Sequence, residues 1–515
     1  VARGLWRRSH LGLSTDSVLM TPRLRAAALI VGPALAVSLY LLLPSSYITT
    51  AGDVVPLSDA ARSAAAVGLW MAIWWLTEAI PIYATALLPL ALFPLTGAAP
   101  MAVAANAYAH PLIYLFLGGF VLALAIEKWG VHRRMALAVL GRVGTQPARV
   151  IGAFMAISAF TSMWVTNTAT TIMLLPVATS VLALTQAEEG DTDRQQNFTI
   201  CLLLGIAYAS SIGGIGTIIG TAPNLFVVSF LESQTGTEIS FLRWMAAGIP
   251  LVLVFVPATW WLLVRRTFSL PTGRFEGVAR ELSLQREQQG PMGSGARRTV
   301  GVFLGTALAW ITRPFLNEIT VMGWQPLAGL TDAGIAVIGA LVLFVTPVNI
   351  RERRFLMDWE TAVHLPWGLL ILFGGGLSLA SALDGSGFSA FLGSRVTALG
   401  VLPEVLLIAL VVGLMIFLTE LTSNTATTAT LIPVLFAVAG GLGIDPILMV
   451  VPAGIAASCA FMLPVATPPN AIVFGSGKLT ISQMSRAGLR LNLLGIILIT
   501  GLAYAVIMPV LRMAL

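Results

Sequence analysis

The chain alternates between long apolar stretches and short polar segments from Arg25 almost to its last residue. Many of the apolar stretches reach about 20 residues, the length of helix that crosses about 30 Å of hydrocarbon. This pattern predicts an all-α polytopic membrane protein with about 11 transmembrane helices. The predicted spans lie near residues 26–43, 62–77, 79–97, 112–127, 198–230, 245–264, 299–312, 333–347, 367–383, 447–474 and 489–511.

Two further apolar segments have the wrong length for a single crossing. Residues 150–186 contain no Asp, Glu, Lys or Arg, yet they are too long for one span. Residues 403–440, later in the chain, are likewise too long for one span. Each predicts a re-entrant helical hairpin, in which two half-length helices fold back at a polar tip. Gly and Pro residues also interrupt the spans 198–230 and 447–474, which predicts broken helices there.

The two halves of the chain repeat the same motifs at a constant spacing. Thr166-Asn167-Thr168 matches Ser423-Asn424-Thr425, with 424 − 167 = 257, and Gly220-Thr221 matches Ala466-Thr467, with 466 − 220 = 246. Each predicted repeat holds an odd number of crossings and one hairpin, so the second repeat is inverted in the membrane, as in secondary transporters. The predicted units are a tail with the first helix (1–59), a first repeat with its hairpin at about 150–186 (60–264), a basic cytoplasmic linker (265–298) and a second repeat with its hairpin at about 403–440 (299–515).

Composition supports lipid as the solvent of this chain. Of its 515 residues, 57% are hydrophobic and 10% are charged, whereas soluble domains carry roughly 25% charged residues. The net charge of +6 comes from basic residues in short loops between apolar segments. This distribution fits the positive-inside rule rather than a nucleic-acid partner, and it predicts a cytoplasmic N-terminus and an external C-terminus. Cys201 and Cys459 lie inside apolar segments, which argues against a disulfide or a metal site.

The matched motifs have the chemistry of an ion-coupled anion site. At a hairpin tip the backbone leaves helical geometry, so Thr hydroxyls and Asn amides can cap the following helix. The free N–H groups of that helix favour an anionic carboxylate, while carbonyl and Asn oxygens suit a hard monovalent cation. Neither motif contains Lys or Arg. A dianion bound there needs neutralising cations, which favours coupling to Na+.

These motifs, together with SIGGIGTIIGTAPN (Ser211–Asn224) and MLPVATPPN (Met462–Asn470), resemble those of the divalent anion:sodium symporter family. The resemblance implies a homodimer that carries di- or tricarboxylates or sulfate by an elevator-like movement. It implies one sodium site at Ser162, Asn167 and Gly220 and another at Thr419, Asn424 and Ala466. The implied substrate contacts are Asn167, Thr168, Thr221, Ser423, Asn424, Thr425, Thr467 and Pro468. Thr166 departs from the family pattern, which has Ser at this position.

The combined interpretation is sodium-coupled symport of C4-dicarboxylates (succinate, malate or fumarate) in a bacterial cytoplasmic membrane. A sulfate or other inorganic-anion carrier, and a proton-coupled or exchange variant, are the alternatives within transport. An ion channel is the alternative outside it, although two pockets for cation and anion fit a carrier better. An enzyme is disfavoured, because no His, Cys or carboxylate cluster accompanies the motifs. Among the intramembrane acids, Glu420 stands out because it lies three residues before a motif.

Overall fold

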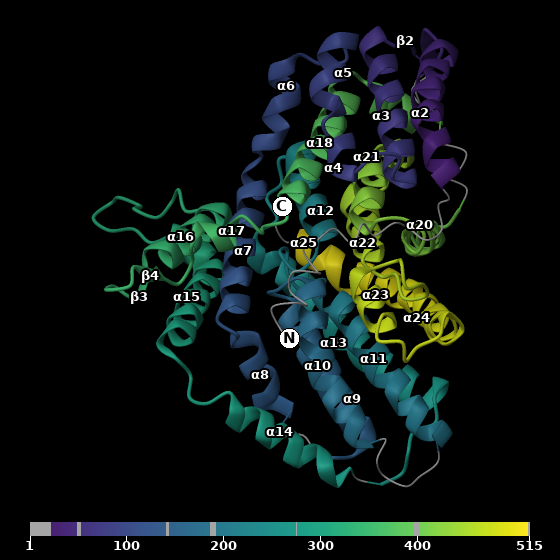
Figure 1. Cartoon of the computed structure of the whole chain (residues 1–515). Helices are drawn as coiled ribbons and strands as arrows, with labels where there is room; N and C mark the ends of the chain where they lie inside the picture. The colour runs from purple at the N-terminus through teal and green to yellow at the C-terminus, as the bar shows by residue number, and fades with distance from the viewer. Residues whose placement is uncertain are drawn as a thin grey trace.

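The computed structural model of the chain is almost entirely helical (Figure 1). Two short antiparallel strand pairs accompany the helices: β1 (Ser46–Ile48) pairs with β2 (Val54–Pro56), and β3 (Pro347–Asn349) pairs with β4 (Arg354–Phe355). The structure describes residues 22–48, 53–140, 144–185, 192–273, 275–395 and 402–512. The predicted N-terminal tail therefore lies mostly outside the described residues.

The first half of the chain forms a helix outside the predicted repeats, followed by the helices of the first repeat. In chain order these are α2 (Pro22–Leu42), α3 (Asp59–Thr77), α4 (Ile82–Thr85), α5 (Leu88–Thr96), α6 (Met101–Asn106), α7 (Pro111–Lys128), α8 (Val131–Leu140), α9 (Pro147–Ser162), α10 (Asn167–Thr185), α11 (Thr192–Gly214), α12 (Ala222–Thr235) and α13 (Phe241–Trp261).

The second half begins with α14 (Glu276–Gln288), which lies in the segment predicted as a linker. The helices that follow are α15 (Ser294–Asn317), α16 (Asp332–Val345), α17 (Trp359–Ala362), α18 (Trp367–Gly385), α19 (Phe388–Arg395), α20 (Glu404–Thr419), α21 (Asn424–Leu442), α22 (Pro446–Ala457), α23 (Pro468–Phe474), α24 (Ile481–Leu502) and α25 (Met508–Arg512). Short π-helical turns at Leu262–Thr267 and Ala503–Ile507 extend α13 and α24.

The helices have the lengths and composition expected of a polytopic membrane protein. Within the described ranges, nine helices are long and apolar enough to cross a membrane. Four shorter apolar helices are Ile82–Thr96, Asp332–Val345, Glu404–Thr419 and Pro446–Ala457. The apolar helix Ile82–Thr96 lies within the predicted span at 79–97, but a turn at Ala86 and Leu87, which was not predicted, separates α4 from α5. Pro89 at the start of α5 lacks the N–H that a continuous helix would use there.

The helix ends follow the spacing of the sequence repeat. In the first hairpin, α9 and α10 run over 147–162 and 167–185, and in the second, α20 and α21 run over 404–419 and 424–442. Three pairs of ends differ by 257 residues (404 − 147, 419 − 162 and 424 − 167). Gly443 ends α21 in the left-handed region at φ 67°, where glycine carries no Cβ penalty. The repeated sequence thus produces a repeated local structure.

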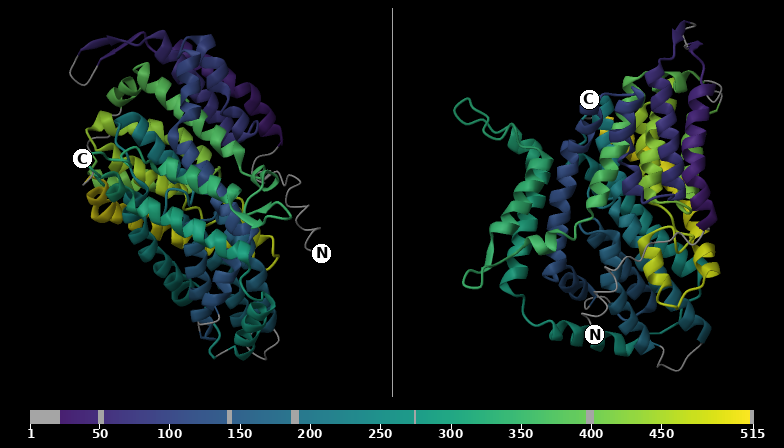
Figure 2. Two further views of the ribbon diagram at one scale, coloured as in Figure 1. Left: turned by 90° about the vertical axis from the view of Figure 1, so that its left-hand side faces the viewer. Right: turned by 45° about the horizontal axis from the view of Figure 1, so that its top comes forward.

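The two halves interlock through their hairpins. In Figure 1, α9 and α10 lie in the lower part of the molecule and α21 lies in the upper part. α10 packs against α23 of the other half, and α21 packs against α12 of the first half. Outside this centre, α2 packs on α3 and α7 packs on α16. In Figure 2, the right-hand view shows α15 and α16 at one side of the molecule, with their connecting loop projecting outward.

Candidate functional site

The first hairpin tip joins a serine and an asparagine through their side chains. α9 ends at Ser162, which is fully buried, and α10 begins at Asn167, so the chain turns over residues 163–166. The Ser162 hydroxyl donates a hydrogen bond to Asn167 Oδ1. The Thr171 hydroxyl, one turn further along α10, donates to the backbone oxygen of Asn167 (2.9 Å). Two oxygens predicted to bind sodium therefore lie side by side at this tip.

The break between α11 and α12 brings a third predicted ligand to the same place. A Cβ added to Gly214 would lie 2.7 Å from Asn167 Oδ1 and 2.9 Å from the backbone oxygen of Gly220. Glycine at this position lets the backbone come this close to the tip. Ser162, Asn167 and Gly220 thus provide a hydroxyl, an amide oxygen and a backbone carbonyl around one point. Oxygen ligands of this kind suit a hard cation.

The second hairpin tip repeats this arrangement. The Thr419 hydroxyl donates to Asn424 Oδ1 (2.6 Å) and is also 3.0 Å from the backbone oxygen of Ala457. The Thr428 hydroxyl donates to the backbone oxygen of Asn424 (2.7 Å), as Thr171 does to Asn167. Ala466 is buried in the second break, where its own amide donates to Leu463 (3.2 Å). One contact between the tip and the break therefore runs through Ala457 on this side.

The two breaks meet each other at the centre of the molecule. The hydroxyl oxygens of Thr221 and Ser458 lie 3.4 Å apart, one from each break. Thr221 and Thr467 precede their helices with nearly identical extended backbones, at φ −147° and −142°. Thr467 is buried, whereas the adjacent Pro468 is exposed. A continuous series of contacts thus connects Asn167 to Asn424 through the two breaks.

Four helices begin at a predicted site residue or directly after one. α10 starts at Asn167, α12 at Ala222, α21 at Asn424 and α23 at Pro468. The first turns of α10 and α21 carry free N–H groups and partial positive charge, which favour a bound anion, whereas α23 begins with Pro468 and Pro469, which have no N–H group. Both motifs were predicted to cap the helix that follows, but only the first motif does so through a side chain. Thr166 accepts from the Ala169 amide (3.3 Å), whereas Ser423 makes no side-chain cap.

Glu420 has a role that the sequence did not reveal. Its carboxylate is buried and accepts hydrogen bonds from the Phe461 and Met462 amides at 2.6 and 2.8 Å and from the Leu463 amide at 3.0 Å. Asn492 of α24 donates a fourth hydrogen bond to it, at 2.8 Å. Since charge-assisted hydrogen bonds are the stronger ones, Glu420 anchors the second break to the second hairpin tip. Its position before the motif was the available signal, but its partners are far away in the sequence.

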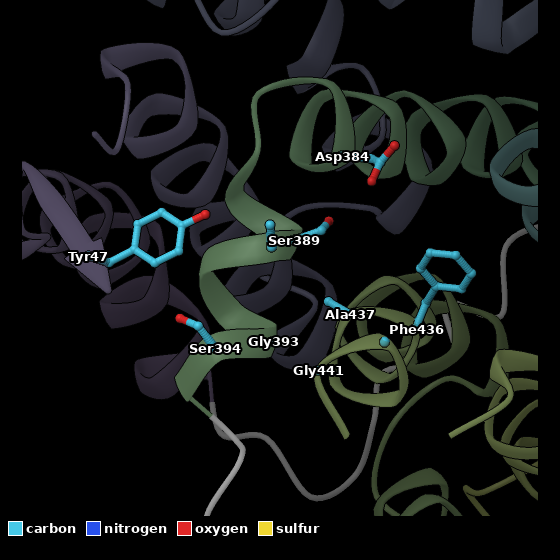
Figure 3. A pocket seen from close by; sticks show the side chains of 10 residues that line it. Tyr47, Asp384, Ser389, Gly393, Ser394, Phe436, Ala437 and Gly441 are labelled. Carbon is cyan, nitrogen blue, oxygen red and sulfur yellow. The ribbon is translucent and has the colours of Figure 1, made fainter. Parts of the chain in front are cut away.

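A separate cavity of about 380 Å³ lies away from the matched motifs (Figure 3). Its lining includes Tyr47 of β1, Asp384 of α18, Ser389 of α19 and Phe436 of α21. Among the described residues, the lining includes one carboxylate and no Lys or Arg, so these residues offer no countercharge to a dianion. None of the predicted sodium or substrate residues belongs to its lining.

Comparison with known proteins points to one family. The model of the sodium:sulfate symporter transmembrane region matches residues 38–512. A relative named sodium-dependent dicarboxylate transporter SdcS, from Staphylococcus saprophyticus, is 39% identical over 460 residues and covers 88% of both chains. The SdcS protein of Staphylococcus aureus is 38% identical over 449 residues, covering 86% of this chain and 85% of its own.

Two solved structures share the fold at low sequence identity. The Alcanivorax borkumensis YdaH transporter has a TM-score of 0.60 and 15% identity, covering 94% of this chain and 97% of its own. The Neisseria gonorrhoeae MtrF efflux pump has a TM-score of 0.57 and 8% identity, covering 93% and 94%. These structures confirm the predicted fold class, and the family model with the Staphylococcus relatives confirms the prediction of a transporter rather than an enzyme. The chain belongs to the sodium:sulfate symporter family, as the resemblance of its matched motifs predicted.

Proposed function

We propose that this protein is a secondary active transporter that moves C4-dicarboxylates, such as succinate, malate and fumarate, together with Na+. The observation that carries this proposal is the doubled arrangement of Ser162 with Asn167 and Thr419 with Asn424. Each pair presents oxygen atoms to a cation beside the N-terminus of a helix that can bind a carboxylate. The names of the Staphylococcus relatives support sodium and dicarboxylate as the transported species.

In this proposal the cations and the anion occupy one composite site. One Na+ is bound by Ser162, Asn167 and Gly220, and another by Thr419, Asn424 and Ala466. The dicarboxylate lies between them, because neither motif supplies a fixed positive charge and the bound cations reduce the cost of burying a dianion. The proposed substrate contacts are Asn167, Thr168, Thr221, Ser423, Asn424, Thr425, Thr467 and Pro468.

We further propose an elevator-like movement of one group of helices against another. The hairpins and broken helices pack on one another across the two halves, as α10 does on α23 and α21 does on α12. A second group, including the pairs α2–α3, α7–α16 and α15–α16, packs around them. The division into repeats at 60–264 and 299–515, joined by the segment 265–298, remains part of the proposal. The homodimer is proposed from the family resemblance.

The proposed location is the bacterial cytoplasmic membrane, with the N-terminus inside and the C-terminus outside. Contacts among the basic loops support a common cytoplasmic side. Arg134 donates to the backbone of Gln289 and Gly290 in the linker, both at 2.8 Å. Arg490 donates to the backbone of Arg266 at 3.2 Å. Loops that contact one another lie on the same side of the bilayer, where basic residues are favoured.

The proposal is tested by uptake of labelled succinate into proteoliposomes with an imposed Na+ gradient. We expect saturable uptake that requires Na+ on the side from which succinate enters. Uptake driven equally by a proton gradient in Na+-free buffer would contradict the sodium coupling, and a flux that does not saturate would indicate a channel.

The name of the family model favours sulfate as the second candidate substrate. Competition separates the two candidates in the same assay. Inhibition of labelled succinate uptake by unlabelled succinate, malate and fumarate but not by sulfate supports the dicarboxylate. If sulfate is itself taken up and succinate is not, the protein is an inorganic-anion carrier and the dicarboxylate function is rejected.

A further inference from the structure

Two fully buried asparagines occupy matching positions just after the two breaks. Asn224 is the third residue of α12 and Asn470 is the third residue of α23, and 470 − 224 = 246, the spacing of the surrounding repeat. Both are 0% exposed. Neither belongs to the predicted sodium or substrate residues. A buried primary amide needs hydrogen-bond partners, so its partners indicate what it does.

The side chain of Asn224 binds backbone carbonyl groups of the first break. Its side-chain nitrogen donates to the backbone oxygens of Gly214 (3.0 Å) and Thr217 (2.8 Å), with a longer contact to Ile215 (3.4 Å). A helix that stops at Gly214 leaves such carbonyls without intrahelical donors. Trp244 of α13 adds a donor to the Ile215 oxygen (2.9 Å). The carbonyl groups of Gly214, Ile215 and Thr217 are therefore held mainly by this one amide and one indole.

Asn470 holds the second break in the same way. Its side-chain nitrogen donates to the backbone oxygens of Ala460 (3.1 Å) and Leu463 (3.0 Å). Its backbone amide donates to the hydroxyl of Thr467 (3.3 Å), which is a proposed substrate contact. Chance packing does not explain why the same type of side chain occupies both matching positions and has the same kind of partner in each.

The segments that these amides hold are the ones that carry the proposed ion ligands. Gly214 adjoins both Asn167 Oδ1 and Gly220 O, so a shift of Gly214 moves two ligands of the first sodium site relative to each other. In the second break, Leu463 accepts from the amide of Ala466 (3.2 Å), the residue proposed to bind the second sodium. The carbonyls held by the asparagines do not include those of Gly220 or Ala466.

We propose that Asn224 and Asn470 are positioning residues that set the sodium affinity of the two half-sites. Each side-chain amide binds neighbouring backbone carbonyl groups of its break. These hydrogen bonds fix the backbone, so that the oxygen of Gly220 or Ala466 is directed toward the ion. This inference rests on the proposed sodium-coupled function. It adds a role for two residues that do not themselves bind the transported species.

Replacement of each asparagine by aspartate provides the test, because aspartate keeps the size of the side chain but replaces the NH2 donor by oxygen, and its added negative charge by itself would strengthen Na+ binding rather than weaken it. Asn224→Asp and Asn470→Asp are compared with Asn197→Asp on α11. Asn197 donates to the backbone oxygen of Ser269 (3.1 Å), far in sequence from either break. All three substitutions remove an amide donor from a backbone oxygen, but the bond of Asn197 is exposed and only Asn224 and Asn470 lie beside a proposed ion site.

The measurement is the Na+ dependence of labelled succinate uptake, together with the KM for succinate at saturating Na+. We expect Asn224→Asp and Asn470→Asp to raise the Na+ concentration for half-maximal uptake by about tenfold or more, on the order of one buried hydrogen bond. The KM for succinate at saturating Na+ is expected to stay within about twofold of wild type. Asn197→Asp is expected to leave both values unchanged.

Size-exclusion chromatography and thermal unfolding establish that each variant is folded. If an aspartate variant does not fold, Asn224→Ser and Asn470→Ser keep one donor at each position and are expected to show a smaller shift in the same direction. An unchanged Na+ dependence in folded variants of both asparagines would overturn the inference. A succinate KM that rises as much as the Na+ requirement would also overturn it. Wild-type protein without Na+-dependent uptake would instead contradict the proposed function itself.

Discussion

The two hairpin tips share a plan but are supported in different ways. Position 163 of the first tip corresponds to position 420 of the second (420 − 163 = 257), and these positions hold Met163 and Glu420. The Met163 backbone oxygen accepts from the Thr217 hydroxyl (2.5 Å), whereas the Glu420 side chain accepts from three amides of the second break. Both tips are bound to their own break, but one uses a neutral backbone group and the other a carboxylate.

The next position differs as well. Trp164 of the first tip is half-buried and packs against Phe241 of α13 and Phe303 of α15, with ring centroids 6.1 and 5.1 Å away. Its counterpart Leu421 is 54% exposed. The first tip is therefore supported by aromatic packing from other helices, and the second by a buried charge. The comparison indicates that the repeat preserves the atoms proposed to bind Na+, while the supporting contacts have diverged.

The largest expected effect comes from removing the shared feature of both tips. Asn167→Ala and Asn424→Ala each delete an amide oxygen proposed to bind Na+. Because an interaction with a charged group contributes about 1.5–3 kcal/mol, we expect Na+ activation to weaken by about 10- to 100-fold or more. Na+-driven succinate uptake at ordinary Na+ concentrations is then lost, while the protein stays folded. Near-normal uptake in either variant would remove that motif from the site.

Glu420→Gln tests the support that only the second tip has. The substitution removes the negative charge and turns an amide group toward backbone N–H donors, so we expect a loss of about 1.5–3 kcal/mol in the free energy of unfolding. Met163→Leu at the matching position conserves volume and is expected to cost less than about 1.5 kcal/mol. Thermal unfolding of both variants in detergent measures the difference. Equal stability of the two would show that the carboxylate does not anchor the second break.

Trp164→Ala tests the support that only the first tip has. It removes two aromatic pairs, each contributing about 0.5–1.5 kcal/mol beyond its buried area, so we expect a destabilisation of about 1–3 kcal/mol. Leu421→Ala serves as the matched control. Because Leu421 is largely exposed, its truncation is expected to change stability by less than about 0.5 kcal/mol. A larger effect at Leu421 than at Trp164 would reverse the comparison of the two tips.

The smallest expected effect concerns Thr166, the one motif position that departs from the family pattern. Thr166→Ser keeps the hydroxyl that accepts from the Ala169 amide and removes a methyl group. A buried methyl contributes about 0.8 kcal/mol, so we expect the KM for succinate to change by no more than about fourfold. The Na+ dependence is expected to stay at the wild-type value. A change in the preferred dianion would instead assign Thr166 to substrate selection.

Local sequence signals were sufficient for most of the fold. Apolar length, the uncharged segment at 150–186 and the Gly and Pro interruptions predicted the hairpins and the broken helices, because these features depend on residues close together in the chain. The split between α4 and α5 and the helix α14 were not predicted. The first depends on a short turn in an otherwise apolar stretch, and the second lies in a polar segment without a membrane-spanning pattern.

The supporting residues of the site could not be predicted in the same way. The motif spacing identified Asn167 and Asn424, but the partners of Glu420 lie about forty residues further along, at Phe461 to Leu463. Asn224 and Asn470 were visible as the last residues of two matched motifs, yet only the fold shows which carbonyls they bind. Repetition in the sequence reveals what the halves share. It does not reveal long-range contacts that only one half has.

The central claim is that the two tips form one site that needs Na+ to bind its anion, because the motifs contain no cationic residue and Glu420 adds a negative charge nearby. Equilibrium binding of labelled succinate to the purified protein, measured with and without Na+ at constant ionic strength, tests this claim most directly. We predict saturable binding in Na+ that is lost when choline replaces it. Equally tight binding of succinate in Na+-free buffer would contradict the account.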